Sequence, residues 1–302
     1  TRGADGAASP VTCVSDASPT MGLFSSKMNA EGNYDPSPFS LLVATVSKTD
    51  YAKQKYDTKY TGTKPILVVC TDEGLMKMKN GKVFSSGNHP IETLVPMLHF
   101  RDAGFSFDIA TASGKPVVLE MWAYPNKDEN VKNLHDEIRA KMQSPKKLAD
   151  ISNLDGYSGI FVPGGHGSML NLPSNVHLGK LLNIAHARAM PTVVLCHAPC
   201  VYLSTCLDGT GQTECAYKGY KTMCFTDKSD AVTPKVGYLP GPMPWKVQEA
   251  IEAKGLEVVN KSETGATIVD RELITGDGPK AANNLGILAA PLLVKFAVEH
   301  NL

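Results

Sequence analysis

The chain has 302 residues, of which 42% are apolar and 20% charged, as in an ordinary globular protein. This length allows one large domain with a sizeable core, or a core with a smaller appendage. The 30 Lys and Arg balance the 30 Asp and Glu, so charge gives no reason to expect nucleic acid or an anionic membrane as a partner.

Seven cysteines at irregular spacing predict a reduced protein rather than a disulfide framework. No two of them form a CxxC pair, the spacing typical of thiolate zinc sites and redox motifs. We find neither an apolar run as long as a membrane span nor a secretory signal. We therefore expect a cytoplasmic protein. Because the sequence begins at Thr1 rather than Met, a removed targeting segment and an organelle stay open.

The elements follow from the pattern of apolar residues. Residues 1–33 are rich in small and polar residues and predict a tail without a fixed fold. From residue 64 onward, short apolar runs alternate with segments of helical periodicity. The predicted strands cover residues 65–70, 105–111, 117–122, 159–165, 192–196, 220–226, 256–260, 266–270 and 272–276. The predicted helices cover residues 90–103, 128–143, 175–190, 198–207, 244–254 and 280–299.

This alternation predicts an α/β domain over residues 34–302, with a mostly parallel sheet and helices on both of its faces. Two segments do not fit the alternation. They are residues 34–60, which carry Pro and several aromatic residues, and about residues 115–150. We expect these two segments to form a small cap over the sheet.

The segment LCHAP (195–199) is the most informative motif. It follows a buried strand and starts a helix, with Pro199 in the first turn. Such a strand–turn–helix junction places Cys196 in a tight elbow at the carboxyl edge of the sheet, where ligands bind. The helix N-terminus favours the thiolate, which is a strong nucleophile toward carbonyl carbon. The alternative is a small buried hydrophobic residue, the usual state of a free Cys.

His197 is the candidate proton shuttle, because adjacent residues at an elbow can both face the cleft. Its alternative is a packed or surface histidine. Asp227 and Asp230 follow a predicted strand, and from the residues alone either one could orient His197.

Two further segments end near the same edge of the sheet. Glu92 lies in the first turns of a predicted helix, where a thiolate and burial would raise the pKa of its carboxyl group. A glutamate that merely favours a helix start is the simpler interpretation. In PGGHG (163–167), the backbone N–H groups of Gly164 and Gly165 could face an oxyanion, although a glycine turn after a strand is common.

The motifs together resemble the ThiJ/PfpI (DJ-1) superfamily, and within it the class of heat-shock protein 31 and the glutathione-independent glyoxalases III. The resemblance covers about residues 30–300, and the motifs occur in one order, which makes it specific. The matching stretches are FSSGNHPIETLVP (84–96), WAYPNKDE (122–129), PKKLAD (145–150), IFVPGGHG (160–167), VLCHAP (194–199), TPKVGYLPG (233–241) and LITGDGPKAANNLG (273–286).

The resemblance implies a flavodoxin-like doubly wound fold with a small cap domain, and a homodimer. It also implies the roles of particular residues. These are Cys196 as nucleophile, His197 beside it, Glu92 as the acidic neighbour, Asp230 rather than Asp227 as the third member of the triad, and Gly165 on the oxyanion side.

Two departures from the family pattern stand out. Bacterial members carry a His–Glu–His metal site, and the corresponding positions here are Arg101, Ser106 and Asn126. A guanidinium group does not bind a metal, so we predict that this site is lost. Ala198 replaces a usual glycine, which could narrow the pocket, and Cys200 replaces a usual alanine.

We therefore expect a glyoxalase III-type lyase of the lactate dehydratase class, which converts methylglyoxal or another small 2-oxoaldehyde to lactate without a metal or organic cofactor. Cys196 would form a hemithioacetal, Glu92 or His197 would move a proton through an enediol, and water would release the product. The alternatives are a holdase that binds unfolded client proteins on exposed apolar surface, and a small cysteine peptidase or amidase.

Overall fold

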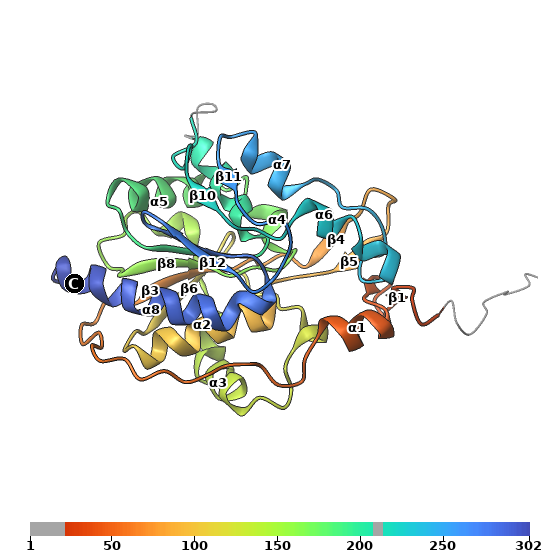
Figure 1. Ribbon diagram of the computed structural model, residues 1–302, viewed down its shortest axis with the longest axis horizontal. Helices are drawn as coiled ribbons and strands as arrows, with labels where there is room; N and C mark the ends of the chain where they lie inside the picture. The colour runs from red at the N-terminus through yellow and green to blue at the C-terminus, as the bar shows by residue number, and fades with distance from the viewer. Residues whose placement is uncertain (1–21, 208–213) are drawn as a thin grey trace, which may run out of the picture.

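The computed structural model describes residues 22–207 and 214–302; residues 1–21 and 208–213 lie outside the described part (Figure 1). Its centre is a seven-stranded sheet in which all neighbouring strands pair in parallel, except the antiparallel pair of β12 and β13. In spatial order the strands are β12 (Thr267–Asp270), β13 (Leu273–Gly276), β9 (Thr192–Leu195), β8 (Gly159–Val162), β3 (Ile66–Val69), β6 (Phe107–Thr111) and β7 (Lys146–Lys147).

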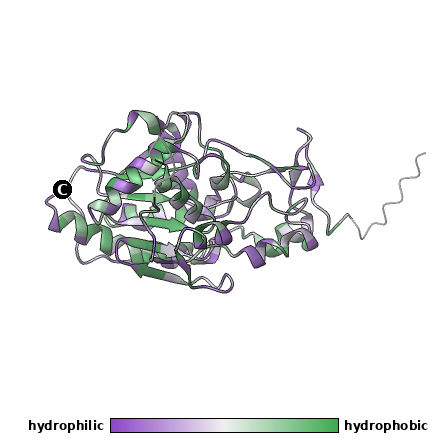
Figure 2. Ribbon diagram, turned by 90° about the horizontal axis from the view of Figure 1, so that it is seen from above, coloured by the Kyte–Doolittle hydropathy of each residue, from purple (hydrophilic) through white to green (hydrophobic). Residues whose placement is uncertain are grey.

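The central strands are continuous apolar runs because both of their faces are covered. Every residue of β3, β8, β9 and β13 is buried. In β3, Ile66 and Val68 pack into one hydrophobic cluster and Leu67 and Val69 into another. Figure 2 shows the strands of this sheet as mostly hydrophobic. The predicted sheet with two covered faces is therefore confirmed.

Helices form a layer on each face of the sheet (Figure 1). On one side one helix packs against two others, and on the other side a 3₁₀ helix packs against three α-helices. The first layer contains α2 (Pro90–Asp102), α3 (Glu129–Gln143) and α8 (Ala282–Glu299). The second contains α4 (Ser168–Asn171), α5 (Val176–Ala187), the 3₁₀ helix η3 (Ala198–Cys206) and α7 (Val247–Glu252). This is a doubly wound, flavodoxin-like arrangement.

The helical segment Pro279–Glu299, which contains α8 and the short helix η5 (Pro279–Ala281), is long and apolar enough to cross a membrane by length and composition. Most of it is buried inside the protein, against α2 and β13. A core helix of a globular fold meets the same criteria, and this packing accounts for its apolar character.

A second, four-stranded sheet lies beside the main one, and the sequence did not predict it. Its spatial order is β1 (Lys27–Met28), β2 (Tyr34–Asp35), β5 (Val83–Ser85) and β4 (Leu75–Lys77). Part of the predicted tail belongs to this sheet, and Phe24 contacts Phe39 of α1 (Pro38–Ala44) with ring centroids 4.6 Å apart. The rest of the predicted tail, residues 1–21, lies outside the described residues.

Two predicted strands are wrong in whole or in part. Residues 117–122 make only one bridge, between Leu119 and Asn88, before the short helix η1 (Met121–Ala123). Residues 220–226 contain only β10 (Lys221–Thr222), which pairs with β11 (Glu257–Val258) outside the main sheet. The remaining short helices are η2 (Leu148–Asp150), α6 (Asp227–Asp230) and η4 (Thr233–Val236).

The segments expected to form a cap lie in two different places. Residues 34–60 include β2 and α1 and then run along α2 and α8, where Tyr56 bonds His99 and Ala52 bonds Asn283. Within residues 115–150, α3 lies in a helix layer of the main sheet, and the part before η1 crosses the carboxyl edge of the sheet.

Candidate active site

Cys196 follows β9 directly and adopts a φ of 63°, a left-handed conformation that costs free energy in a residue with a side chain. Two backbone hydrogen bonds hold it there. Its N–H donates to Gly276 O at 3.1 Å, and Phe225 N–H donates to Cys196 O at 2.8 Å. The elbow predicted from LCHAP is therefore present. Only 4% of the surface of Cys196 is exposed.

A relay of polar atoms runs from this cysteine. Cys196 Sγ lies 3.2 Å from His197 Nδ1, and His197 Nε2 lies 3.0 Å from Asp230 Oδ2. The ring of His197 stacks on Phe225 with centroids 4.8 Å apart. Burial opposes the charge of Asp230, but His197 and further hydrogen bonds outweigh it and hold the pKa of this carboxyl well below its usual range. Asp230, at the end of this relay, is therefore ionised.

The structure distinguishes between the two aspartates that the residues alone left open. Asp230 at the end of α6 points to His197. Asp227 instead accepts hydrogen bonds from the backbone N–H groups of Gln248 and Glu249 in the first turn of α7. Asp227 therefore anchors a helix start and does not orient the histidine.

Glu92 lies in the first turn of α2 and is completely buried. Among the described residues its carboxylate oxygens have no partner other than the thiol of Cys196. Burial raises the pKa of Glu92 well above its usual range. A protonated Glu92 beside the sulfur can donate a hydrogen bond to it, which a simple helix-start glutamate does not do.

The thiol itself differs from the sequence-based expectation. We expected the helix N-terminus to favour the thiolate, but burial and then the charge of Glu92 raise the pKa of Cys196, opposed by the backbone N–H of Gly165. Burial opposes a negative charge on either group, and each charge disfavours the other, so Glu92 and Cys196 do not ionise together.

The glycine turn after β8 completes the surroundings of the sulfur. A Cβ at Gly164 would lie 2.1 Å from Glu92 Oε2 and 2.5 Å from Cys196 Cβ, so only glycine fits between them. Gly165 has a φ of +109°, and a Cβ there would lie 2.5 Å from the backbone N of His89. These two positions require glycine because the backbone passes so close to the site.

Two buried side chains in this region were missed by the sequence analysis. His166 Nε2 lies 3.2 Å from Asp230 Oδ1, and Glu120 Oε1 lies 4.0 Å from His166 Nδ1. His166 was visible as the histidine of PGGHG, whereas Glu120 lay in a predicted strand. The ligand atoms of His166, His197 and Asp230 lie within 4.8 Å of one another, as for a metal site, yet both histidines already bond the carboxylate.

The positions of the family's metal ligands lie elsewhere. Arg101, near the end of α2, donates from Nη1 to Glu137 Oε2 at 3.2 Å. The expected absence of that metal site stays a prediction.

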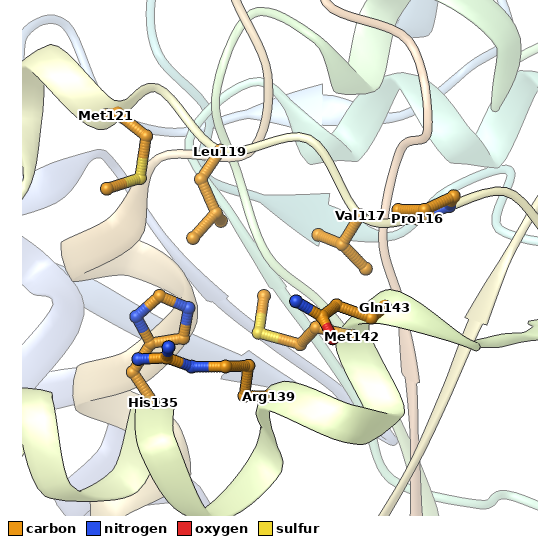
Figure 3. A pocket seen from close by; sticks show the side chains of 8 residues that line it. All are labelled: Pro116, Val117, Leu119, Met121, His135, Arg139, Met142 and Gln143. Carbon is orange, nitrogen blue, oxygen red and sulfur yellow. The ribbon is translucent and has the colours of Figure 1, made fainter.

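A separate groove of about 400 Å³ lies between residues 116–121 and α3 (Figure 3). Its walls contain none of the polar groups described above. The residues that line the groove are Pro116, Val117, Leu119 and Met121 on one side, and His135, Arg139, Met142 and Gln143 on the other.

Comparison with known proteins shows close relatives along most of the chain. The protein is 42% identical over 274 residues to the "Protein/nucleic acid deglycase HchA" of Pseudomonas aeruginosa, covering 88% of this chain and 94% of the relative. The chain belongs to the HchA family. It is also 40% identical over 266 residues to HchA of Escherichia coli, covering 86% and 92% of the two chains. The resemblance to the heat-shock protein 31 class of the ThiJ/PfpI superfamily is thereby confirmed.

Solved structures agree with the HchA assignment at the level of the fold. Glyoxalase III from Candida albicans matches with a TM-score of 0.60 and 21% identity, over 76% of this chain and 98% of that one. The encystment protein REP24 of Francisella tularensis matches with a TM-score of 0.63 and 19% identity, over 76% and 99%. No protein-family model matches the chain.

Proposed function

We propose that this protein converts methylglyoxal and similar small 2-oxoaldehydes to 2-hydroxy acids without glutathione, using Cys196 as the nucleophile. The observation that carries the proposal is the position of the sulfur, with His197 Nδ1 3.2 Å away and a buried Glu92 beside it. A nucleophile, a base and a neutral acid around one atom are the groups that an isomerisation of a 2-oxoaldehyde requires.

The reaction begins when the Cys196 thiolate attacks the aldehyde carbon while Glu92 donates its proton to the aldehyde oxygen, which gives a hemithioacetal. His197 Nδ1 then takes the proton from that carbon, and the electrons move onto the former ketone oxygen, which gives an enediolate. The Glu92 carboxylate moves the hydroxyl proton from the oxygen of the first carbon to that of the second, and His197 returns its proton to the second carbon, which gives a thioester of the hydroxy acid. Water hydrolyses the thioester, so that methylglyoxal and one water become lactate and the thiol is regenerated.

The surrounding groups support these steps. Asp230 lies 3.0 Å from His197 Nε2 and can accept a hydrogen bond from it, and in the tautomer that makes this bond Nδ1 has no proton and acts as the base. The N–H of Gly165 lowers the pKa of Cys196, so it is a donor directed at the sulfur and at negative charge formed next to it. These steps use only side chains and backbone groups of this chain.

The small exposed area of Cys196 supports a small substrate. With 4% of the residue exposed, a three-carbon aldehyde meets far less hindrance than a glycated side chain of a macromolecule. The HchA relatives, however, are named for glycated proteins and nucleic acids, a substrate class that the net charge of the chain did not suggest. Removal of an aldehyde from such adducts by the same thiolate is the second candidate activity.

A lactate-production assay tests the proposal. Wild-type protein and Cys196→Ala are each given methylglyoxal without glutathione, and lactate is measured. The proposal predicts turnover by the wild type only.

A second assay tests the deglycase activity. A glycated peptide is supplied with a scavenger that consumes free methylglyoxal. Repair that continues at the same rate with the scavenger favours the deglycase activity, whereas repair that stops favours the free aldehyde as substrate. Aminoacyl amides test the amidase alternative.

A holdase activity is a further candidate, supported by exposed apolar side chains beside the small sheet. Leu42 and Val43 of α1 are 79% and 62% exposed, and Met28 of β1 is 62% exposed. Exposed apolar area of this kind can bind unfolded client proteins.

The lactate dehydratase class, the homodimer and the cytoplasmic location rest on the family resemblance and on composition, and they remain parts of this proposal.

A further inference from the structure

Asp230 is shared by two histidines. His197 Nε2 lies 3.0 Å from Oδ2 and His166 Nε2 lies 3.2 Å from Oδ1, so each carboxylate oxygen has one imidazole. The two rings face each other with centroids 4.0 Å apart. All three side chains are at least 95% buried. The relay to Cys196 uses only His197, which leaves His166 without a role.

The second nitrogens of the two rings face different groups. His197 Nδ1 faces Cys196 Sγ at 3.2 Å, whereas His166 Nδ1 faces Glu120 Oε1 at 4.0 Å. Glu120 accepts a hydrogen bond from Ser86 through Oε1, and its Oε2 has no hydrogen-bond partner among the described residues. An unpartnered oxygen on a buried carboxylate is costly unless a positive charge lies nearby.

We propose that His166 is a positioning residue that carries the positive charge balancing Asp230 in the resting enzyme, held there by Glu120, and so keeps His197 uncharged and able to act as the base. This role deepens the proposed function and rests on it, because a base is needed only if Cys196 performs that chemistry.

Two buried imidazoles 4.0 Å apart do not both carry a charge, because like charges at this distance repel strongly where water is excluded. The single negative charge of Asp230 stabilises one protonated imidazole. The positive charge is more stable on the ring that also faces a second carboxylate. That ring is His166, because Glu120 faces its other nitrogen, whereas the other nitrogen of His197 faces the thiol of Cys196, whose pKa is raised by burial.

Other titratable groups near His166 do not change this balance. Burial lowers the pKa of His89 to about 3 and raises that of Tyr238, so both are uncharged near neutral pH. Burial raises the pKa of Glu120 to about 7, opposed by His166 itself. The titratable groups that face His166 from the surrounding elements are His89, Glu120, His197, Asp230 and Tyr238.

Removal of His166 therefore transfers its charge to His197. A protonated His197 is no longer a base, so kcat begins to fall at a higher pH than in the wild type as the solution is acidified. We expect this shift to be about one pH unit, the size expected of one neighbouring charge. The same protonated ring stabilises the adjacent thiolate, so Cys196 becomes more reactive toward an alkylating agent at low pH. Turnover and alkylation thus change in opposite directions.

The experiment measures both quantities between pH 5 and 9 for wild type, His166→Ala, His166→Gln and Glu120→Gln. Turnover is followed with methylglyoxal, and alkylation of Cys196 with iodoacetamide by peptide mass spectrometry. At pH 6 we expect about tenfold lower kcat and several-fold faster alkylation in both His166 variants, and a smaller change of the same signs in Glu120→Gln. The alkylation result is independent of whether methylglyoxal is the substrate.

His186→Ala is the matched control, because it removes a histidine bonded to a carboxylate, Glu272, at 2.8 Å on α5. Its pH profiles should match the wild type. Gln at position 166 keeps a donor for Asp230 without a charge. Wild-type profiles for His166→Gln, or a parallel loss of turnover and alkylation in both His166 variants, would overturn the proposal in favour of a structural hydrogen bond.

Discussion

Cys196 Sγ and His197 Nδ1 lie 3.2 Å apart although the two residues are adjacent in the chain. Adjacent side chains usually point to different sides of an extended backbone. Here the φ of 63° at Cys196 turns the chain so that both groups face the same site, which makes the nucleophile and its base one local unit. Asp230, from the distant helix α6, then fixes the outer nitrogen of the histidine.

Glu92→Gln tests whether this carboxyl group acts as an acid. The side chain keeps its size, but an amide cannot transfer a proton to the aldehyde oxygen. We expect kcat with methylglyoxal to fall by about 10² to 10³, the usual contribution of a positioned acid. Glu129→Gln is the control, since Glu129 is an exposed glutamate in the first turn of α3, bonded to Lys132. Equal activities of the two variants would reduce Glu92 to a helix-start residue.

The same variant should change the pH dependence of stability. Unfolded Glu92 loses its proton near pH 4.3, about its ordinary value, whereas burial keeps the folded carboxyl protonated to much higher pH. The folded state binds more protons in this window, so its free energy of unfolding falls by up to about 1.4 kcal/mol per pH unit as pH rises. In Glu92→Gln, position 92 makes no such contribution to the pH dependence of the free energy of unfolding, because an amide does not titrate.

Urea unfolding at pH 5, 6 and 7 measures this effect. The stability of Glu92→Gln relative to wild type should increase with each step in pH. A constant difference between the two proteins would show that the folded carboxyl ionises at its ordinary pH and is not the proton donor proposed above.

Gly164→Ala tests the close approach of the glycine turn to the site. The new Cβ would lie 2.1 Å from Glu92 Oε2 and 2.5 Å from Cys196 Cβ, so backbone or catalytic groups must move. We expect a loss of about 1–3 kcal/mol in unfolding free energy and a large loss of turnover. Gly156→Ala is the control, because a Cβ there meets no atom within 4 Å, and its stability should change by less than about 0.5 kcal/mol.

The holdase activity is tested on α1. The double variant Leu42→Ser, Val43→Ser removes two exposed apolar side chains, and we expect it to suppress aggregation of a heated client enzyme less than wild type does. Val298→Ser on α8, where 59% of Val298 is exposed, is the matched control. Light scattering measures the aggregation. Equal suppression by all three proteins would remove α1 from the client-binding surface.

The central fold was predictable because its signals are local. Each of the strands β3, β8 and β9 is a short apolar run, and such runs are buried wherever they lie in a parallel sheet. The cysteine elbow was predictable for the same reason, since strand, turn and helix follow one another in LCHAP (195–199).

The predictions from sequence are wrong where hydrogen bonds to side chains of distant segments replace regular backbone pairing between strands. The predicted strand 220–226 ends early because the N–H of Met223 donates to the side chain of Thr275 and that of Cys224 to Asn260, rather than to a neighbouring strand. Glu120 lay within the mostly apolar run 117–122, which predicted a strand. Its place beside His166 depends on where the chain crosses the sheet edge, which no local pattern specifies.

Direct detection of a covalent intermediate on Cys196 tests the proposed mechanism at its first step. Wild-type protein is mixed with methylglyoxal, quenched in acid within one turnover, digested and analysed by mass spectrometry. The peptide that contains Cys196 should gain the mass of one methylglyoxal, and hydroxylamine should release it as lactohydroxamate, the signature of a thioester. Lactate formation without this adduct, or at an unchanged rate in Cys196→Ala, would rule out Cys196 as the nucleophile.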